Sequence, residues 1–398
     1  MSAPELGLVG VGSGPGGLAA VRSLRERDAD RPVTMITEDS QLPYARPPLT
    51  KDFLRGESDL DELWLTDPEW LGEHRIEVRR GTRVRELDPR RRLLVLADGS
   101  SVGYGNVVLA TGSRPVRLPL PGGDHPDVLY IRDLGSGRRL RELAAGRDGR
   151  IVVVGSGFIG CEAAASLAIR GRDVVLVTGE DLPHAARLGE AAGGQIHGWL
   201  QEAGVETRLG TPVAAITRTG TGFDLALEDG TRLSADSVVI GGGASPDLGL
   251  AEGANLSIRD GGVEVDASMR TSAPHVFAVG DLACAYNTAA GRHLRVEHWG
   301  DAEAHGEIAG AALAGDLRSW DDPPGFWSTI GDKTLKYSAW GDGHDYWVFT
   351  GSPDRWAVWF RSGDELCGVL THEDDDAYER GQQLLSRRAA FEEIPTSK

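Results

Sequence analysis

Two glycine-rich segments of one type occur in this chain, and they constrain its fold more than any other feature. Gly12-Ser13-Gly14-Pro15-Gly16-Gly17 follows the apolar run 6–11, and Gly155-Ser156-Gly157-Phe158-Ile159-Gly160 follows the apolar run 151–154. An alanine-rich helical pattern comes directly after each segment. In such strand–turn–helix units the glycines allow a tight turn, let the backbone approach a pyrophosphate and let the helix pack on its strand. The pair predicts a protein that holds two dinucleotides, usually in order to pass electrons between them.

Length and charge exclude several classes of protein. A chain of 398 residues is too long for a single core, so two or three domains are expected. The net charge of −18 argues against nucleic-acid binding. No apolar run approaches the ~20 residues of a membrane span. The first residues lead almost at once into a predicted strand, with no signal-peptide pattern. We therefore expect a cytoplasmic protein with neither nucleic-acid nor membrane partners.

The cysteines and acidic clusters indicate no metal site. Cys161, Cys284 and Cys367 do not follow C-x-x-C or metal-ligand spacing, which excludes a disulfide framework and disfavours iron–sulfur and zinc sites. The acidic run 373–376 is interpreted as a solvated loop or helix start. We expect no bound metal.

Candidate cofactor contacts surround the first glycine segment. The predicted strand 33–37 ends at Glu38, which either binds a ribose or caps a solvated strand end. The proline-rich segment 42–51 predicts a rigid loop that presents Arg46 and Lys51. Because the chain has four lysines against 38 arginines, a lysine here suggests a specific role.

Small residues mark two further places where backbone could approach a ligand. A buried strand over 107–109 runs into the turn Ala110-Thr111-Gly112, and prolines at 115, 119 and 121 then mark a crossing to the second unit. That unit ends in an apolar strand followed by glycines 241–243, of which Gly242 is a candidate cofactor contact.

The chain changes character after residue 316. Apolar stretches at 335–340, 345–350, 355–361 and 366–371 are separated by Gly-Asp-Gly, Ser-Pro-Asp and Ser-Gly-Asp turns, which predicts an antiparallel meander, and a polar helix is expected over about 374–390. The sequence thus predicts an α/β protein with two Rossmann-like dinucleotide-binding units and a C-terminal α+β domain that carries an antiparallel sheet.

The order of these motifs resembles that of the FAD- and NAD(P)-dependent ferredoxin reductases of bacterial oxygenase systems. The proline-rich Pro-Pro-Leu-Thr-Lys loop and the Glu-His-Trp triplet are the most specific matches. The matching segments span nearly the whole chain and are 12–17, 43–51, 110–115, 155–162, 271–281, 297–299 and 326–328.

The resemblance implies three domains of a glutathione reductase-like fold. A discontinuous FAD-binding domain would comprise 1–117 and 242–316, with an NAD(P)-binding domain, 118–241, inserted in it. The C-terminal domain, 317–398, would lie beside the flavin.

The resemblance also implies roles for individual residues. Gly12, Gly14 and Gly17 would contact the pyrophosphate of FAD, and Glu38 its adenosine ribose. Asp281 would lie near the ribityl or pyrophosphate portion. The backbone at His298 and Trp299 would reach the flavin ring, and Arg46 and Lys51 would line the flavin. The nicotinamide cofactor would lie on the second segment, with contacts from Gly155, Gly157, Phe158, Ile159 and Gly160. Glu162 would pair with Lys51 beneath the nicotinamide, and Trp327 would lie against the other face of the flavin. Lys51, Glu162 and Trp327 are thus the expected catalytic residues.

The second ribose position leaves the coenzyme open. The predicted strand 174–177 ends in Thr178-Gly179-Glu180, so the carboxylate comes later than in NAD-specific relatives. His184 and Arg187 follow and could meet a 2′-phosphate. Either NADH or NADPH is compatible with this pattern.

The acceptor is less certain than the cofactors. The resemblance implies a ferredoxin-type iron–sulfur protein, but residues 317–398 carry a net charge of −6, whereas an acidic ferredoxin favours a basic docking surface. One alternative is an NAD(P)H oxidase, or a reductase of quinones or ascorbate radical, with oxygen or a small molecule as acceptor. Another is a nucleotide-sensing interaction protein similar to apoptosis-inducing factor. Either a monomer or a homodimer is expected.

Overall fold

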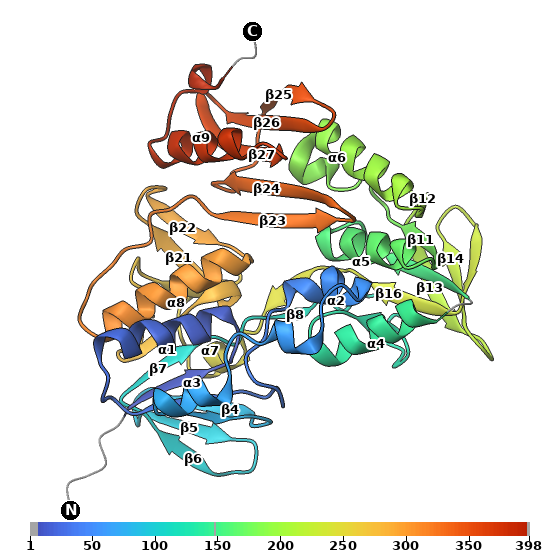
Figure 1. The fold of residues 1–398 in the computed structure, drawn as a ribbon. Coiled ribbons are helices and arrows are strands. Elements are labelled where there is room, and N and C mark those ends of the chain that lie inside the picture. Colours follow the sequence, from blue (N-terminus) through green and yellow to red (C-terminus); the bar gives the residue numbers. More distant parts are fainter. Residues whose placement is uncertain (1–6, 147–148, 396–398) are drawn as a thin grey trace, which may run out of the picture.

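The computed structural model describes residues 7–146 and 149–395, and its first parallel sheet is built around the first glycine segment (Figure 1). The strand order is β20-β7-β1-β2-β3. These strands are β1 (Leu8–Val11), β2 (Val33–Ile36), β3 (Ile76–Arg79), β7 (Asn106–Leu109) and β20 (Val276–Ala278). Strand β1 is buried along its whole length, as expected for a parallel strand covered on both faces. Because β20 comes from much later in the chain, this unit is assembled from two separate stretches of sequence.

The second glycine segment lies in a second parallel sheet with the order β12-β11-β10-β16-β9. Its strands are β9 (Leu129–Tyr130), β10 (Arg150–Val154), β11 (Asp173–Val177), β12 (Glu206–Arg208) and β16 (Ser237–Ile240). The two dinucleotide-binding units predicted from the sequence are therefore both present. The chain passes between them at β8 (Ser113–Pro115) and β17 (Ala244–Pro246), which pair with each other in antiparallel register.

Smaller sheets, in which most strand pairs are antiparallel, and the helices complete the two units. The remaining strands are β4 (Val84–Asp88), β5 (Leu93–Leu96), β6 (Ser101–Gly103), β13 (Val213–Arg218), β14 (Phe223–Leu227), β15 (Arg232–Ala235), β18 (Ile258–Arg259), β19 (Gly262–Val265), β21 (Ala283–Asn287) and β22 (Arg292–Arg295). The helices are α1 (Pro15–Arg27), α2 (Asp52–Arg55), α3 (Pro68–Glu73), α4 (Leu134–Ala145), α5 (Phe158–Ile169), α6 (Ala185–Glu202), α7 (Gly249–Gly253) and α8 (Trp299–Leu313). None of the helices in the described residues combines the length and apolar character that a membrane crossing requires.

Helices α1 and α8 lie side by side in very close contact (Figure 1). A Cβ atom added at Gly306 would lie 2.2 Å from the carbonyl oxygen of Gly16, and one added at Gly310 would lie 2.4 Å from that of Ala20. The two helices can approach this closely because these positions of α8 carry no side chain. Their contact brings the start of α8 to the first glycine turn.

The C-terminal sheet has the order β23-β24-β27-β26-β25. Its strands are β23 (Gly325–Ile330), β24 (Lys333–Ala339), β25 (Tyr346–Ser352), β26 (Arg355–Ser362) and β27 (Glu365–His372), and helix α9 (Asp375–Ser386) follows. All neighbouring strands are antiparallel, as predicted, but the simple meander is wrong: β27 inserts between β24 and β26. The segment after β24 crosses to the far edge, so that β27 can pair on both sides.

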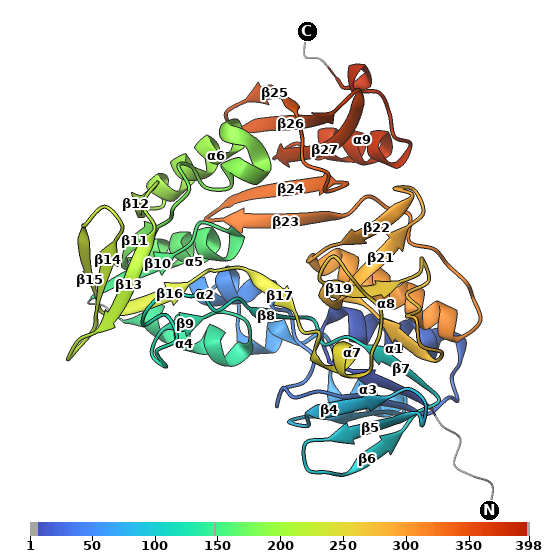
Figure 2. The ribbon, with the colours of Figure 1, turned by 180° about the vertical axis from the view of Figure 1, so that it is seen from behind.

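This sheet packs on the second unit through one face and on α9 through the other. Trp356, Val358 and Phe360 of β26 belong to an apolar cluster with residues of α5 and α6, whereas Trp359 packs with Leu384 of α9. Figure 2 shows the sheet above both dinucleotide-binding units. Strand β23 at its lower edge consequently faces the junction between them.

Candidate functional site

A cavity of about 2430 Å³ runs along the junction of the three parts of the molecule. Its lining comes from both glycine turns, the proline-rich loop, strand β22, the start of α8 and strand β23. A space of this size, continuous between two parallel sheets at the carboxyl ends of their strands, suits two extended ligands. Most of the predicted site residues are brought together here from positions far apart in the sequence.

The first glycine turn forms a cradle that side chains would fill. Gly12 has a φ of 109°, and a Cβ there would lie 2.1 Å from the carbonyl oxygen of Ala110. A Cβ at Gly17 would lie 2.5 Å from the carbonyl oxygen of Gly12. Helix α1 begins directly after Gly14, so its unpaired backbone N–H groups face the cavity. The turn therefore fits the pyrophosphate of a dinucleotide.

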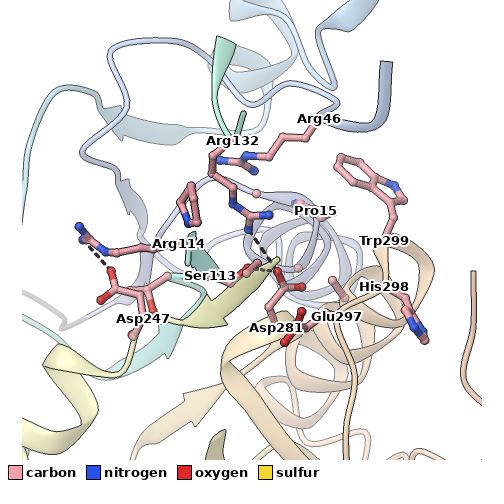
Figure 3. Close-up of a pocket in the computed structure, with 18 of the residues that line it drawn as sticks. Pro15, Arg46, Ser113, Arg114, Arg132, Asp247, Asp281, Glu297, His298 and Trp299 are labelled. Carbon is pink, nitrogen blue, oxygen red and sulfur yellow. Dashed lines mark hydrogen bonds and ion pairs between the residues drawn. The ribbon is translucent and has the colours of Figure 1, made fainter. Parts of the chain in front are cut away.

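Two arginines face the same part of the cavity as this turn. Arg46 extends toward Arg132, whose own guanidinium points to Asp281 (Figure 3), and the Nε of Arg46 is buried without a hydrogen-bond partner among the described residues. Arg132 pairs with Asp281 at 3.1 Å, and the Ser113 hydroxyl donates to the same carboxylate at 2.6 Å. Burial lowers the pKa of the Arg132 guanidinium, an effect that Asp281 opposes and Arg46 strengthens. Two neighbouring cations, one with a free donor, match an anionic ligand.

The sequence analysis missed Arg132 and Ser113 as site residues. Arg132 lies between β9 and α4 and belongs to no motif, and one arginine among 38 carries no compositional signal. Ser113 follows the predicted Ala110-Thr111-Gly112 turn, whose three residues all line the cavity. Only the pairing with Asp281, 168 residues away from Ser113, singles it out.

Glu38 lies at the outer end of the first cradle. Its side chain is 57% exposed and faces Arg114 at 3.5 Å and Arg83 at 3.7 Å. It lines the cavity just beyond the end of β2. This position fits the ribose role better than that of a carboxylate directed away from the site.

Lys51 and Glu162 meet where the two units face each other. The Lys51 ammonium lies 2.9 Å from Glu162 Oε2, and both side chains are at most 10% exposed. The Thr50 hydroxyl donates to the same oxygen at 2.6 Å, and the Ser328 hydroxyl of β23 donates to Oε1 at 2.7 Å. A buried ion pair with several hydrogen bonds keeps a fixed geometry, because an unpaired charge at this depth would be costly. Lys51 and Glu162 both line the cavity, whereas Ser328 does not.

The second glycine turn repeats the form of the first. Gly155 has a φ of 101°, and a Cβ there would lie 2.6 Å from the carbonyl oxygen of Gly241. A Cβ at Gly160 would lie 2.1 Å from the carbonyl oxygen of Gly155. Helix α5 starts after Gly157, and Phe158 and Ile159 of its first turn line the cavity.

The displaced carboxylate Glu180 turns back to this second cradle. Its Oε2 accepts hydrogen bonds from the Ser156 hydroxyl at 2.6 Å and from the backbone N–H of His184 at 3.2 Å. Thr178 supports it, since the Thr178 hydroxyl lies 2.9 Å from Ser156 Oγ and accepts from the Glu180 backbone at 3.2 Å. The two extra residues in this loop thus still bring a carboxylate back to the second glycine turn.

His184 and Arg187, the two side chains considered as partners of a 2′-phosphate, make different contacts. Burial, and secondarily the charge of Arg187, lowers the pKa of His184 to about 4, so its ring is neutral at pH 7. That ring stacks on Phe158 with a centroid distance of 3.9 Å. The Arg187 guanidinium lies over the rings of Phe326 and Tyr337, at 5.3 and 5.9 Å. Neither side chain contacts Glu180 through a charged group.

The residues predicted to lie near the flavin ring line the cavity at the start of α8 and on β23. His298 and Trp299, at the start of α8, line it, and the His298 ring is tied to Asp301 at 2.8 Å. Trp327 also lines the cavity but is 45% exposed, so it is not a core residue of the C-terminal sheet. It lies at the opening, on the face of β23 opposite to Ser328.

Several predicted contacts lie behind the cavity wall. Gly17, Gly155, Gly160, Thr178 and Gly242 are not among its lining residues. The contact of Gly242 with a cofactor stays a prediction: a Cβ there would meet Leu118 at 3.0 Å, and its neighbours Gly241 and Gly243 line the wall. The other glycines shape the turns from behind, where helix and strand approach.

The cysteines lie outside this arrangement. Cys161, Cys284 and Cys367 are all buried and unpaired, and none of them lines the cavity. Burial raises the pKa of the Cys284 thiol to about 11. Among the described residues no cluster of three or more histidine, cysteine or acidic side chains is suited to a metal ion.

Comparisons with known proteins agree with this geometry. The model of the pyridine nucleotide-disulphide oxidoreductase family matches residues 8–306. The anthranilate 1,2-dioxygenase system ferredoxin–NAD(+) reductase component of Burkholderia cepacia is 35% identical over 82% of this chain and 80% of its own length. Rhodocoxin reductase of Rhodococcus erythropolis is 32% identical over 92% and 86%. The chain is also similar to a putidaredoxin reductase in its covalent complex with putidaredoxin, with a TM-score of 0.91 and 28% identity over 97% and 94%.

Proposed function

Because this chain belongs to the pyridine nucleotide-disulphide oxidoreductase family, we propose that it is an FAD-dependent NAD(P)H:ferredoxin oxidoreductase of an oxygenase system. The observation that carries this proposal is one continuous cavity in which two dinucleotide cradles meet at the buried Lys51–Glu162 pair. The acceptor is inferred from the names of two relatives, one of which is a ferredoxin–NAD(+) reductase component and the other a rhodocoxin reductase.

The first cradle binds FAD. Backbone N–H groups at the start of α1 and the cations Arg46 and Arg132 neutralise the pyrophosphate, and Glu38 accepts from the adenosine ribose. Asp281, held by Arg132 and Ser113, accepts from hydroxyls of the ribityl chain. When bound, FAD accepts a hydride from the nicotinamide and releases the two electrons singly.

The second cradle binds the nicotinamide coenzyme. Gly157 and the first turn of α5 receive its pyrophosphate, and Glu180 accepts from the ribose hydroxyls. A 2′-phosphate would lie against the Glu180 carboxylate, and of the two candidate partners near it His184 is neutral and Arg187 lies over two aromatic rings. This arrangement favours NADH over NADPH.

Lys51 and Glu162 act where the two ligands meet. The Lys51 ammonium stabilises negative charge that develops on the reduced ring, and Glu162 holds that ammonium in place.

Electrons leave on the side of Trp327, without passing through a thiol. Trp327 is exposed at the cavity opening, and its cross-strand neighbour on β24 is Lys336. The Lys336 ammonium is held by Asp375 at 2.6 Å. A docking surface of modest charge, centred on an aromatic ring, is compatible with a ferredoxin that is only weakly acidic.

The same observations support the finer parts of the proposal. FAD-binding segments 1–117 and 242–316, an NAD(P)-binding segment 118–241 and a C-terminal domain 317–398 are consistent with the crossing at β8 and β17. Three unpaired cysteines suit the reducing cytoplasm. We expect a monomer or homodimer, which sedimentation of the FAD-loaded protein would distinguish.

The decisive experiment mixes the FAD-loaded protein anaerobically with NADH or NADPH and follows the flavin absorbance, and then adds a [2Fe–2S] ferredoxin. Bleaching at turnover-like rates, faster with NADH, followed by ferredoxin reduction, is expected. Bleaching over minutes with a persistent charge-transfer band would instead support a nucleotide-sensing protein. Rapid bleaching that oxygen or a quinone reverses, but ferredoxin does not, would support the small-acceptor reductase.

A further inference from the structure

The C-terminal sheet contributes a buried hydroxyl to the ion pair at the centre of the cavity. Ser328 of β23 donates a hydrogen bond of 2.7 Å to Glu162 Oε1, across 166 residues of sequence. Ser328 is 1% exposed. The other two donors, Thr50 and Lys51, both use Oε2, so Oε1 depends on Ser328.

Ser328 reaches the reacting region only through Glu162. Lys51 and Glu162 line the cavity, whereas Ser328 does not. Figure 1 shows β23 lying over α5, the helix that carries Glu162. The contact therefore crosses from one structural part to another and fixes the rotation of the carboxylate from behind.

Physical chemistry gives this contact weight. Three hydrogen bonds hold the buried Glu162 carboxylate, and a hydrogen bond to a charged group is stronger than one between neutral groups. Without the Ser328 donor, Oε1 would lose its partner and the carboxylate could rotate. Its negative charge would also be less compensated, which would weaken the effect of the Lys51 ammonium on the neighbouring ring.

We infer that Ser328 is a positioning residue for hydride transfer, through which the C-terminal sheet completes the Lys51–Glu162 site. The inference rests on the proposed function, because it requires that Lys51 and Glu162 act on the flavin and the nicotinamide. It assigns the C-terminal domain a part in the reductive step, in addition to forming the surface on the acceptor side.

The test compares Ser328→Ala with Ser338→Ala in the FAD-loaded protein. Ser338 is also fully buried, lies on the neighbouring strand β24 and has an Oγ without a hydrogen-bond partner among the described residues, so it is a matched control. Three quantities are measured: the limiting rate of anaerobic flavin reduction by NADH, the dissociation constant of NADH from the same titration, and the midpoint potential of the bound flavin. Ser328→Thr, which keeps the hydroxyl, is measured as the rescuing variant.

For Ser328→Ala we expect the limiting rate to fall about tenfold with a dissociation constant changed less than about twofold, and the midpoint potential to become more negative. Ser338→Ala should match wild type, and Ser328→Thr should recover most of the rate. In a Glu162→Gln background the Ser328→Ala effect should shrink, since coupled residues are not additive.

Two outcomes would overturn the inference. In the first, the flavin of the wild type is reduced rapidly, and Ser328→Ala has the same limiting rate of reduction and the same flavin midpoint potential. The other is equal loss in both alanine variants, which would indicate general damage to the sheet. Should Ser328→Ala fail to fold, two other proteins are compared: Ser328→Thr alone and Ser328→Thr combined with Glu162→Gln. Equal rates of flavin reduction in these two proteins would decide against the inference. Slow reduction of wild type itself would contradict the proposed function instead.

Discussion

The Lys51 ammonium lies 2.9 Å from Glu162 Oε2, although the two residues come from different dinucleotide-binding units. Lys51 ends the proline-rich loop of the first unit, and Glu162 lies on helix α5 of the second. The pair is buried, and it marks the place where the two cradles share one cavity.

Replacing Lys51 by alanine removes the positive charge next to the flavin. We expect the limiting rate of flavin reduction by NADH to fall by about a hundredfold, in the range seen when a preorganised electrostatic group is deleted. Lys333→Ala, which removes a lysine at the start of β24, is the control and should leave the rate unchanged. Stopped-flow absorbance measures both, and an unchanged rate in Lys51→Ala would remove Lys51 from the mechanism.

Glu180→Gln tests the coenzyme preference. The wild type should use NADH more efficiently than NADPH, because the carboxylate accepts from ribose hydroxyls and repels a 2′-phosphate. In the variant, kcat/KM for NADH should fall about tenfold while that for NADPH changes little. Glu190→Gln, on the exposed side of α6, should preserve the wild-type preference. A wild-type enzyme that already prefers NADPH would contradict this account.

Arg132→Met tests the residue that no motif revealed. The change removes a cation from the FAD cradle and leaves Asp281 without its ion-pair partner. We expect the dissociation constant of FAD to rise at least about tenfold, measured by fluorescence of released flavin after dilution. Arg79→Met, an exposed arginine paired with Glu77, should retain wild-type affinity. Equal flavin retention in the two variants would be inconsistent with a cofactor role for Arg132.

Gly306→Ala tests the close contact of α1 and α8. The new Cβ would lie 2.2 Å from the carbonyl oxygen of Gly16, so the helices must separate, at a cost of about 1–3 kcal/mol of unfolding free energy. Gly300 lies on the same helix with no atom within 4 Å of an added Cβ. Gly300→Ala should therefore be neutral or stabilise by up to about 1 kcal/mol. Urea titration of both proteins measures the difference, and similar stabilities would refute this packing.

His305 should contribute to a loss of stability in weak acid. Complete burial lowers the pKa of this histidine from 6.5 to about 4. Between these pH values His305 is protonated in the unfolded chain but neutral in the folded protein. The free energy of unfolding is therefore retained above pH 6.5 and falls as the pH drops toward 4. The loss attributable to His305 is roughly 3 kcal/mol. In His305→Leu the free energy of unfolding should depend less on pH over this range. The difference between the two proteins at pH 8 is subtracted, so that the general effect of the substitution does not count. A parallel decline in both proteins would exclude His305 as its source.

The sequence by itself determined the local cradles. A turn such as Gly12–Gly17 is specified by residues a few positions apart, because only glycine tolerates its φ and the close approach of backbone. The strand–turn–helix units, the α/β class and the C-terminal antiparallel sheet could therefore be predicted. The Lys51–Glu162 pair was expected only from the resemblance to a known family.

Tertiary structure decided the contacts that join distant segments. Arg132 reaches Asp281, Ser328 reaches Glu162 and β27 inserts between β24 and β26. None of these follows from a local pattern, because a hydroxyl or a guanidinium can bond any suitably placed carboxylate. Their choice of partner depends on how the sheets pack.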